Sequence, residues 1–119
     1  MRNYPTITGR KIRMALVGCG RIAANHFGAM EQHAEDVEIV DVCDVDRNAL
    51  DKAVQRTGAK GHLSMTDMLK ATTADIVVLT TPSGLHPGQA IEIAESGRHV
   101  MTEKPMATRW HDGLRMVKA

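Results

Sequence analysis

Aromatic residues and charge of one sign are both scarce in this 119-residue chain. Tyr4, Phe27 and Trp110 make up its 3% of aromatic residues, and 15 Lys plus Arg nearly balance 14 Asp plus Glu, for a formal charge of +1. Without a basic stripe or a set of stacking side chains, the chain lacks the usual features of a nucleic-acid-binding surface. We therefore expect no nucleic-acid partner.

Long apolar runs and a signal sequence are also missing. The longest runs, such as residues 76–79, have the length of a strand, far below the roughly 20 residues that span a bilayer. The first eleven residues are not followed by the apolar stretch of a secretory signal. We expect no membrane partner and a cytoplasmic location, where the thiols of Cys19 and Cys43 stay reduced.

Length and composition favour one globular domain. Independent cores rarely form from much less than about 50 residues, and a chain with 43% hydrophobic and 24% charged residues is typical of globular proteins. We expect an N-terminal extension over residues 1–11 and one domain over residues 12–119.

Hydrophobic patterning predicts strands that alternate with helices. Apolar runs predict strands at residues 12–17, 38–43, 60–63, 75–80 and 98–101. Helical spacing and caps predict helices over residues 21–33, from Asp46 to Gly58, after Ser64 or Thr66, from Pro87 to Gly97, and from Thr108 through Val117. Because strands that are apolar throughout must be covered on both faces, the predicted fold class is α/β, a doubly wound parallel sheet.

The last predicted helix runs to Ala119 without a Gly or Asn cap and without a strand after it. A six-stranded dinucleotide-binding domain of the Rossmann type would then lack its last strand. We expect a fragment that is truncated before that strand.

The turn after the first strand carries the pattern G-x-G-x-x-A. Gly18 would permit the tight turn, Gly20 would let a pyrophosphate approach the backbone, and Ala23 would keep the helix close to the strand. The helix N-terminus at Arg21 and Ile22 would then meet the phosphates. The alternative is a glycine turn that only needs backbone freedom, but the strand-turn-helix setting favours a dinucleotide.

An acidic residue ends the second predicted strand. Asp44 could accept both hydroxyls of an adenine ribose, which favours NAD over NADP, although Arg47 lies near enough in sequence to offset its charge. Asp46 could take the ribose instead, but a helix N-cap explains its position fully.

Two further loops leave the same carboxyl edge of the predicted sheet, where a cofactor crevice is expected. Thr80, Thr81 and Pro82 should line the dinucleotide, and His86 is either a site residue or an exposed loop or cap histidine. Glu103 and Lys104 place an acid beside a base where the nicotinamide of the cofactor would bind. A neutral Lys104 amine beside the cationic nicotinamide could accept a hydroxyl proton, although Glu103 would oppose this. A surface ion pair is the alternative for that pair.

Metal chemistry is not expected. The remaining histidines show no spacing with Cys or carboxylates that would form a metal site. They are His26, His33, His62, His99 and His111.

Four ordered motifs, ALVGCGRIAANH, DVCDVD, LTTPSGLHPGQA and MTEKPMAT, resemble those of the glucose-fructose oxidoreductase/inositol dehydrogenase/MocA (Gfo/Idh/MocA) family across almost the whole chain. The resemblance implies a catalytic role for Lys104, places Glu103 and His86 near the nicotinamide ribose, and implies an often cis peptide bond before Pro105. It also implies a second α/β domain, absent here, through which relatives form homo-oligomers.

Within the family, the segments CGRIAANHFGAME, TTPSGLHP and EKPMATRW most resemble bacterial dehydrogenases that oxidise the C3 hydroxyl of UDP-N-acetylglucosaminuronic acid (UDP-GlcNAcA) with NAD, in lipopolysaccharide sugar biosynthesis. The implied substrate is thus a small nucleotide sugar, and the fragment alone is expected to be inactive. The alternatives are a family dehydrogenase for another sugar or polyol, a non-catalytic NAD-sensing module, and a methyltransferase, which lacks an obvious use for Glu103-Lys104-Pro105.

Overall fold

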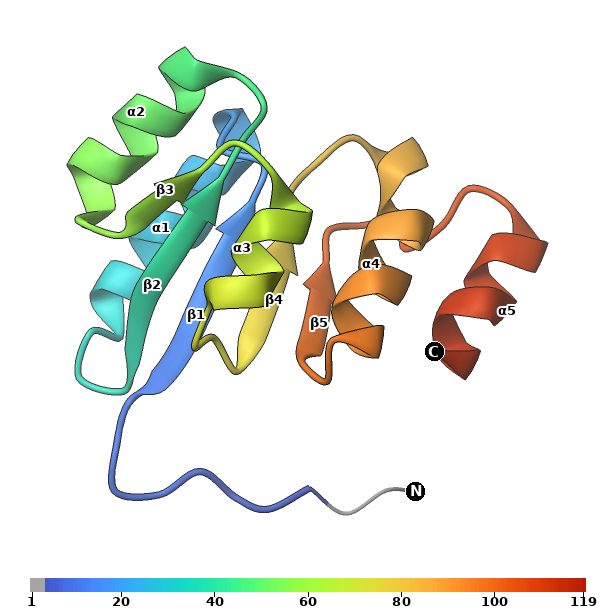
Figure 1. Ribbon diagram of the computed structural model, residues 1–119, viewed down its shortest axis with the longest axis horizontal. Coiled ribbons are helices and arrows are strands. Elements are labelled where there is room, and N and C mark those ends of the chain that lie inside the picture. The colour runs from blue at the N-terminus through green and yellow to red at the C-terminus, as the bar shows by residue number, and fades with distance from the viewer. Residues whose placement is uncertain (1–3) are drawn as a thin grey trace.

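A computed structural model describes residues 4–119 and contains five strands and five α-helices in alternation (Figure 1). The strands are β1 (Ile12–Val17), β2 (Val37–Cys43), β3 (Lys60–His62), β4 (Ile76–Leu79) and β5 (His99–Thr102). The helices are α1 (Arg21–Gln32), α2 (Arg47–Thr57), α3 (Met65–Ala71), α4 (His86–Glu95) and α5 (Trp110–Lys118), with a short 3-10 turn, η1 (Ser83–Leu85), before α4.

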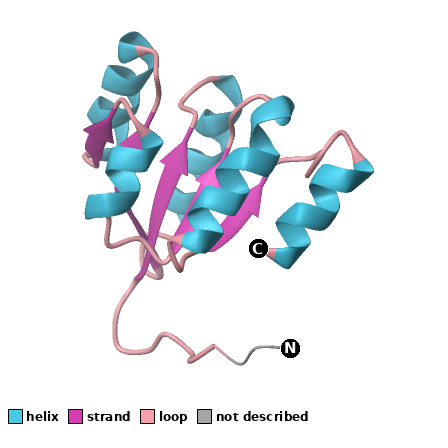
Figure 2. Ribbon diagram, turned by 45° about the vertical axis from the view of Figure 1, so that its right-hand side comes forward, coloured by secondary structure: helices cyan, strands magenta, loops and turns pink. Residues whose placement is uncertain are grey.

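The strands form one parallel sheet in the order β3-β2-β1-β4-β5, with helices on both faces (Figure 2). The order reverses between β1 and β4, which is where open α/β sheets bind ligands beyond the carboxyl ends of their strands. The predicted doubly wound fold is therefore confirmed, and the described residues contain no sixth strand beside β5.

Alternate residues of β1 belong to different cores, which explains why the strand is apolar throughout. Met14 and Leu16 pack in a cluster with α1 and α2, whereas Ala15 and Val17 pack in a cluster with α3 and α4. Burial on both faces thus replaces the alternation of polar and apolar residues seen in half-exposed strands.

The predicted caps hold at two helices and fail at one. Asp46 and Ser64 accept hydrogen bonds from backbone amides at the starts of α2 and α3. Thr108 does not cap α5. The N-cap residue is Arg109, which has an extended backbone and whose side chain makes no capping hydrogen bond. The chain therefore turns into α5 one residue later than a Thr108 cap requires.

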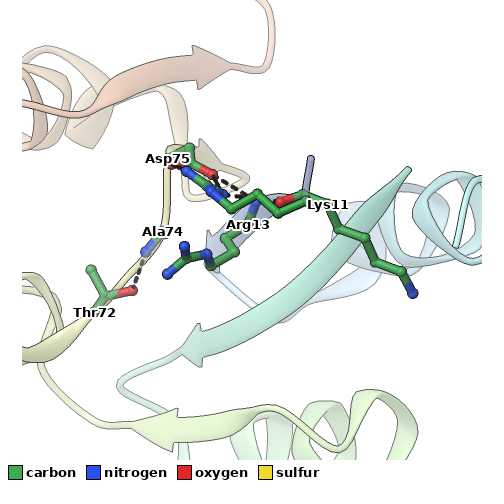
Figure 3. Close-up of polar contacts among 6 residues, drawn as sticks. Lys11, Arg13, Thr72, Ala74 and Asp75 are labelled. Carbon is green, nitrogen blue, oxygen red and sulfur yellow. Dashed lines mark hydrogen bonds and ion pairs between the residues drawn. The ribbon is translucent and has the colours of Figure 1, made fainter. Parts of the chain in front are cut away.

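Asp75, just before β4, connects the start of that strand to the chain before β1. Its carboxylate accepts two hydrogen bonds of 2.8 Å from the Arg10 guanidinium and one of 2.8 Å from the Arg13 amide. Figure 3 shows Asp75 beside Arg13 and Lys11 at the amino ends of the strands, opposite the carboxyl edge. Arg10 therefore ties the segment before β1 to the domain, although the boundary at residue 11 stays a prediction.

The Asp75 contacts predict a specific loss of stability in acid. The Arg10 hydrogen bonds lower the pKa of Asp75 from 3.8 to about 2. The pKa of Asp75 is lower in the folded than in the unfolded state. The ionised Asp75 carboxylate therefore stabilises the fold fully above about pH 4, and this stabilisation is lost as the pH falls through 2. We expect Arg10→Ala to lower the urea midpoint at pH 7, and this difference to shrink between pH 4 and pH 2. Lys11→Ala, which removes an adjacent positive charge, should cause little change; an equal effect of both variants would contradict the Asp75 contact.

Candidate functional site

The first glycine of the G-x-G-x-x-A turn is required by the protein itself. Gly18 has φ +93°, and a Cβ there would lie 2.8 Å from the backbone carbonyl carbon of Thr80. The Thr80 hydroxyl donates to the Gly18 carbonyl, and the Gly18 amide donates to Cys43 over 2.8 Å. The loop after β4 therefore packs directly on the glycine turn.

The second glycine is not required by the protein's own packing. A Cβ on Gly20 would meet no atom within 4 Å, and Gly20 is the N-cap of α1 without a side-chain hydrogen bond. The first turn of α1 contains no acidic residue, so no carboxylate there offsets the partial positive charge of the helix N-terminus, whose first amides have no partner within the helix. Ala23 is 1% exposed and holds α1 against the sheet. This arrangement fits a pyrophosphate, which needs close backbone approach and free amides.

Asp44 connects the glycine turn to the start of α2. Its Oδ2 accepts the Cys19 amide over 2.7 Å, and its Oδ1 accepts the Asp46 amide over 2.8 Å. Each oxygen keeps a further lone pair that a ribose hydroxyl could use. The Asp46 side chain accepts the Asn48 amide over 3.0 Å, so the helix-cap interpretation of Asp46 agrees with its contacts.

The two cysteines lie at this edge as free thiols. Burial and the nearby Asp44 carboxylate raise the pKa of Cys19 to about 12, and the same causes raise that of Cys43 to about 11. Neither thiol is poised as a nucleophile, because the reactive species is the thiolate.

The predicted site residues surround two hollows at the carboxyl edge, on either side of the loop after β4. A cavity of about 590 Å³ is lined by Gly18, Gly20, Asp44, Thr80, Thr81 and Pro82, among others. A second, of about 260 Å³, is lined by Ile22, Thr80, Thr81, Pro82, Ser83, His86, Glu103 and Lys104. Arg21 instead lines a hollow between α1 and α2, together with Gly20. The other predicted residues all line one or both of these two hollows, which share Thr80, Thr81 and Pro82 and together form the crevice.

Glu103 does not form the ion pair with Lys104 that was the alternative interpretation of these two residues. Its Oε1 lies 2.6 Å from Nε2 of His26 on α1, and within residues 4–119 no ion pair joins Glu103 to Lys104. The hydrogen bond from His26 is the main cause that lowers the pKa of Glu103, followed by smaller contributions that include the Lys104 charge. Sequence reasoning missed His26, although it is the last residue of the motif ALVGCGRIAANH.

His86 is buried rather than exposed, so the interpretation as a surface loop histidine is wrong. Its side chain is packed at 1% residue exposure, with Nε2 2.8 Å from the Thr81 carbonyl oxygen and Nδ1 3.0 Å from the Pro105 carbonyl oxygen. The Lys104–Pro105 peptide bond is cis, as the family resemblance implied.

Metal-ligand clusters and membrane-spanning helices are both absent from the described part of the chain. Residues 4–119 contain no group of three His, Cys, Asp or Glu side chains placed to hold a metal ion. None of their helices combines the length and the apolarity needed to cross a bilayer.

The fold and crevice are those of a dinucleotide-binding oxidoreductase domain, and comparison with known proteins gives the family. Residues 12–119 match the Gfo/Idh/MocA oxidoreductase family, NAD-binding Rossmann fold. The chain therefore belongs to this family.

Two solved structures are particularly similar. One is the WlbA dehydrogenase of Chromobacterium violaceum in complex with NADH and UDP-GlcNAcA, with 70% identity, a TM-score of 0.98, and coverage of 99% of this chain and 34% of that one. The other is the WlbA dehydrogenase of Bordetella pertussis with the same two ligands, with 59% identity, a TM-score of 0.93, and coverage of 95% and 34%.

A more distant relative is inositol 2-dehydrogenase 3 of Saccharopolyspora erythraea, which is 30% identical over 108 residues and matches 91% of this chain but 32% of its own length. The chain thus spans about a third of the length of these relatives.

Proposed function

We propose that this chain is the NAD-binding domain of a dehydrogenase that oxidises the C3 hydroxyl of UDP-GlcNAcA to a ketone. The observation that carries the proposal is the 70% identity, over 99% of the chain, to a WlbA dehydrogenase described in complex with NADH and UDP-GlcNAcA. The glycine turn and crevice support the cofactor, since their geometry suits a dinucleotide. By the family resemblance, the longer enzyme would be a cytoplasmic homo-oligomer, with this domain at residues 12–119.

In such an enzyme, different residues of the crevice would bind different parts of the dinucleotide. The turn at Gly18 and Gly20 would hold the pyrophosphate, and Asp44 would orient the adenine ribose. Thr80, Thr81 and Pro82 would form the wall shared by the two hollows. Arg21 and Ile22 would flank the phosphates at the start of α1.

The chemistry would take place in the smaller hollow. When bound there, the nicotinamide of NAD supplies a hydride acceptor for the C3 hydrogen. Lys104 lines this hollow, and its Nζ would take the proton of the C3 hydroxyl, leaving the ketone. Glu103 and His86 lie at the same hollow, near the expected nicotinamide ribose.

The direct test uses the full-length protein with NAD and UDP-GlcNAcA. NADH formation, followed by its absorbance, should accompany a sugar product that is lighter by two hydrogens in mass spectrometry. UDP-N-acetylglucosamine, which lacks the carboxylate, and myo-inositol serve as comparison substrates. Turnover of myo-inositol but not of UDP-GlcNAcA would instead indicate a family dehydrogenase for another polyol or sugar.

Asp44 carries a prediction about the choice of cofactor. Because its carboxylate also holds the Cys19 and Asp46 amides, Asp44→Ala should weaken NAD binding about tenfold or more without creating tight NADP binding. Calorimetric titration with both cofactors checks this. Asp46→Ala removes a carboxylate two residues away and should leave NAD affinity nearly unchanged. If Asp44→Ala bound NADP as tightly as the parent protein binds NAD, Asp44 would act only through repulsion of the 2′-phosphate.

A further inference from the structure

The segment after β5 has unusually little backbone support for a part of the site. β5 is an edge strand, and its ladder ends where the Glu103 amide donates to the Leu79 carbonyl over 3.1 Å. Within the described chain, residues 104–108 make no backbone–backbone hydrogen bond, and the next one joins Gly113 to Arg109. The position of Lys104 must therefore depend on side-chain contacts.

Two histidines supply such contacts, one on each side of Lys104. His26 projects from α1, which packs on one face of the sheet, and binds the Glu103 carboxylate over 2.6 Å. His86 begins α4, which packs on the other face, and its Nδ1 lies 3.0 Å from the Pro105 carbonyl oxygen. The residues before and after Lys104 are thus each held by a histidine from a different layer of the domain.

His86 also reaches the loop after β4. Its Nε2 lies 2.8 Å from the Thr81 carbonyl oxygen, so one buried ring contacts both loops that border the smaller hollow. Carbonyl oxygens can only accept, so a ring nitrogen that binds one must carry a hydrogen. A neutral ring has one N–H and therefore donates to one of the two carbonyls at a time. Loss of the ring would leave both carbonyls without this partner in a buried environment.

We infer that His26 and His86 are positioning residues that hold the Glu103–Pro105 segment from both faces of the sheet and thereby fix where Lys104 enters the hollow. The inference rests on the proposed function, since it assigns the two histidines to the alignment of Lys104. It also explains what Glu103 does, because its carboxylate is bound by His26 and no side-chain acid within residues 4–119 forms an ion pair with Lys104. The Lys104 amine is therefore left available for substrate.

The test compares His26→Leu with His26→Gln in the full-length enzyme. Since misplacement of a catalytic group by about 1 Å can cost 100-fold in rate, we expect His26→Leu to lower kcat about 30- to 100-fold. The KM for NAD should change less than about threefold, because the glycine turn holds the cofactor independently. Glutamine keeps an N–H donor and should recover at least about tenfold of the lost kcat. His33→Gln, at the end of the same helix, is the matched control and should behave like the parent enzyme.

A second measurement does not depend on turnover. Amide hydrogen exchange without cofactor should become faster at Glu103, whose amide donates to the Leu79 carbonyl, in His26→Leu and in His86→Asn, while β1 and α1 stay protected. Unchanged exchange of the Glu103 amide together with unchanged kcat would overturn the inference. A fall in NAD affinity that parallels kcat would also overturn it, because the histidines would then serve the cofactor. An inactive parent enzyme would refute the proposed function, while the exchange experiment would still decide whether the histidines hold the segment.

Discussion

Lys104→Ala is expected to lower kcat of the full-length enzyme about 100- to 10,000-fold, the usual range for loss of a general acid or base. The affinity for NAD should stay within a few-fold of the parent value, because the pyrophosphate and ribose contacts lie at the glycine turn and Asp44. Steady-state kinetics with UDP-GlcNAcA and calorimetric titration with NAD separate the two quantities.

Lys70→Ala is the matched control for Lys104→Ala. Lys70 is an exposed lysine in the last turn of α3 and lines neither hollow of the crevice, so its removal should leave both kcat and NAD affinity unchanged. Full activity of Lys104→Ala would remove this residue from the mechanism. A full-length protein that binds NAD but turns over neither UDP-GlcNAcA nor another sugar would instead support the NAD-sensing alternative.

The two glycines of the turn should respond to alanine in opposite ways. Gly18→Ala places a Cβ 2.8 Å from the Thr80 backbone at φ +93°, and should lower the free energy of unfolding by about 3 kcal/mol or more. Gly20→Ala meets no protein atom within 4 Å and should cost about 1 kcal/mol or less, from weaker capping of α1. The Gly20 variant should nevertheless lose NAD affinity at least about tenfold, since its methyl group occupies the path of the pyrophosphate.

Urea unfolding and NAD titration of both variants test this contrast. Gly113→Ala, in α5 and away from the crevice, is a control for a glycine-to-alanine change that should not weaken NAD binding. Unaltered NAD affinity in Gly20→Ala would mean that no ligand approaches the backbone at the second glycine. The dinucleotide interpretation of the turn would then be wrong.

The fold was predictable from the sequence because its signals are local. The run at residues 12–17 coincides with β1, and Gly58 ends α2 with φ +71° as the helix prediction requires. The predicted strand at residues 98–101 is displaced by one from β5, because Arg98, directly after the turn at Gly97, suits either the turn or the strand, and its amide bonds back to the Ile93 carbonyl. The cap of α5 was misplaced for a similar reason, because Thr108 and Arg109 are both compatible with an extended residue before a helix.

Candidate site residues were predictable where a motif places them at the carboxyl edge, but their partners were not. The contact between His26 and Glu103 spans 77 residues and depends on how α1 packs across the sheet. Burial of His86 likewise follows from tertiary packing, since its sequence position also suits an exposed helix start. Adjacent residues of opposite charge left a Glu103–Lys104 ion pair open as an alternative, whereas the Glu103 carboxylate binds His26.

The central claim is that this domain binds NAD through the glycine turn and Asp44. Parallel calorimetric titration of the 119-residue chain with NAD, NADP and S-adenosylmethionine tests it most directly. We predict clear binding of NAD, weaker binding of NADP because Asp44 repels the 2′-phosphate, and no binding of S-adenosylmethionine. Preference for S-adenosylmethionine, or binding of none of the three, would contradict the account.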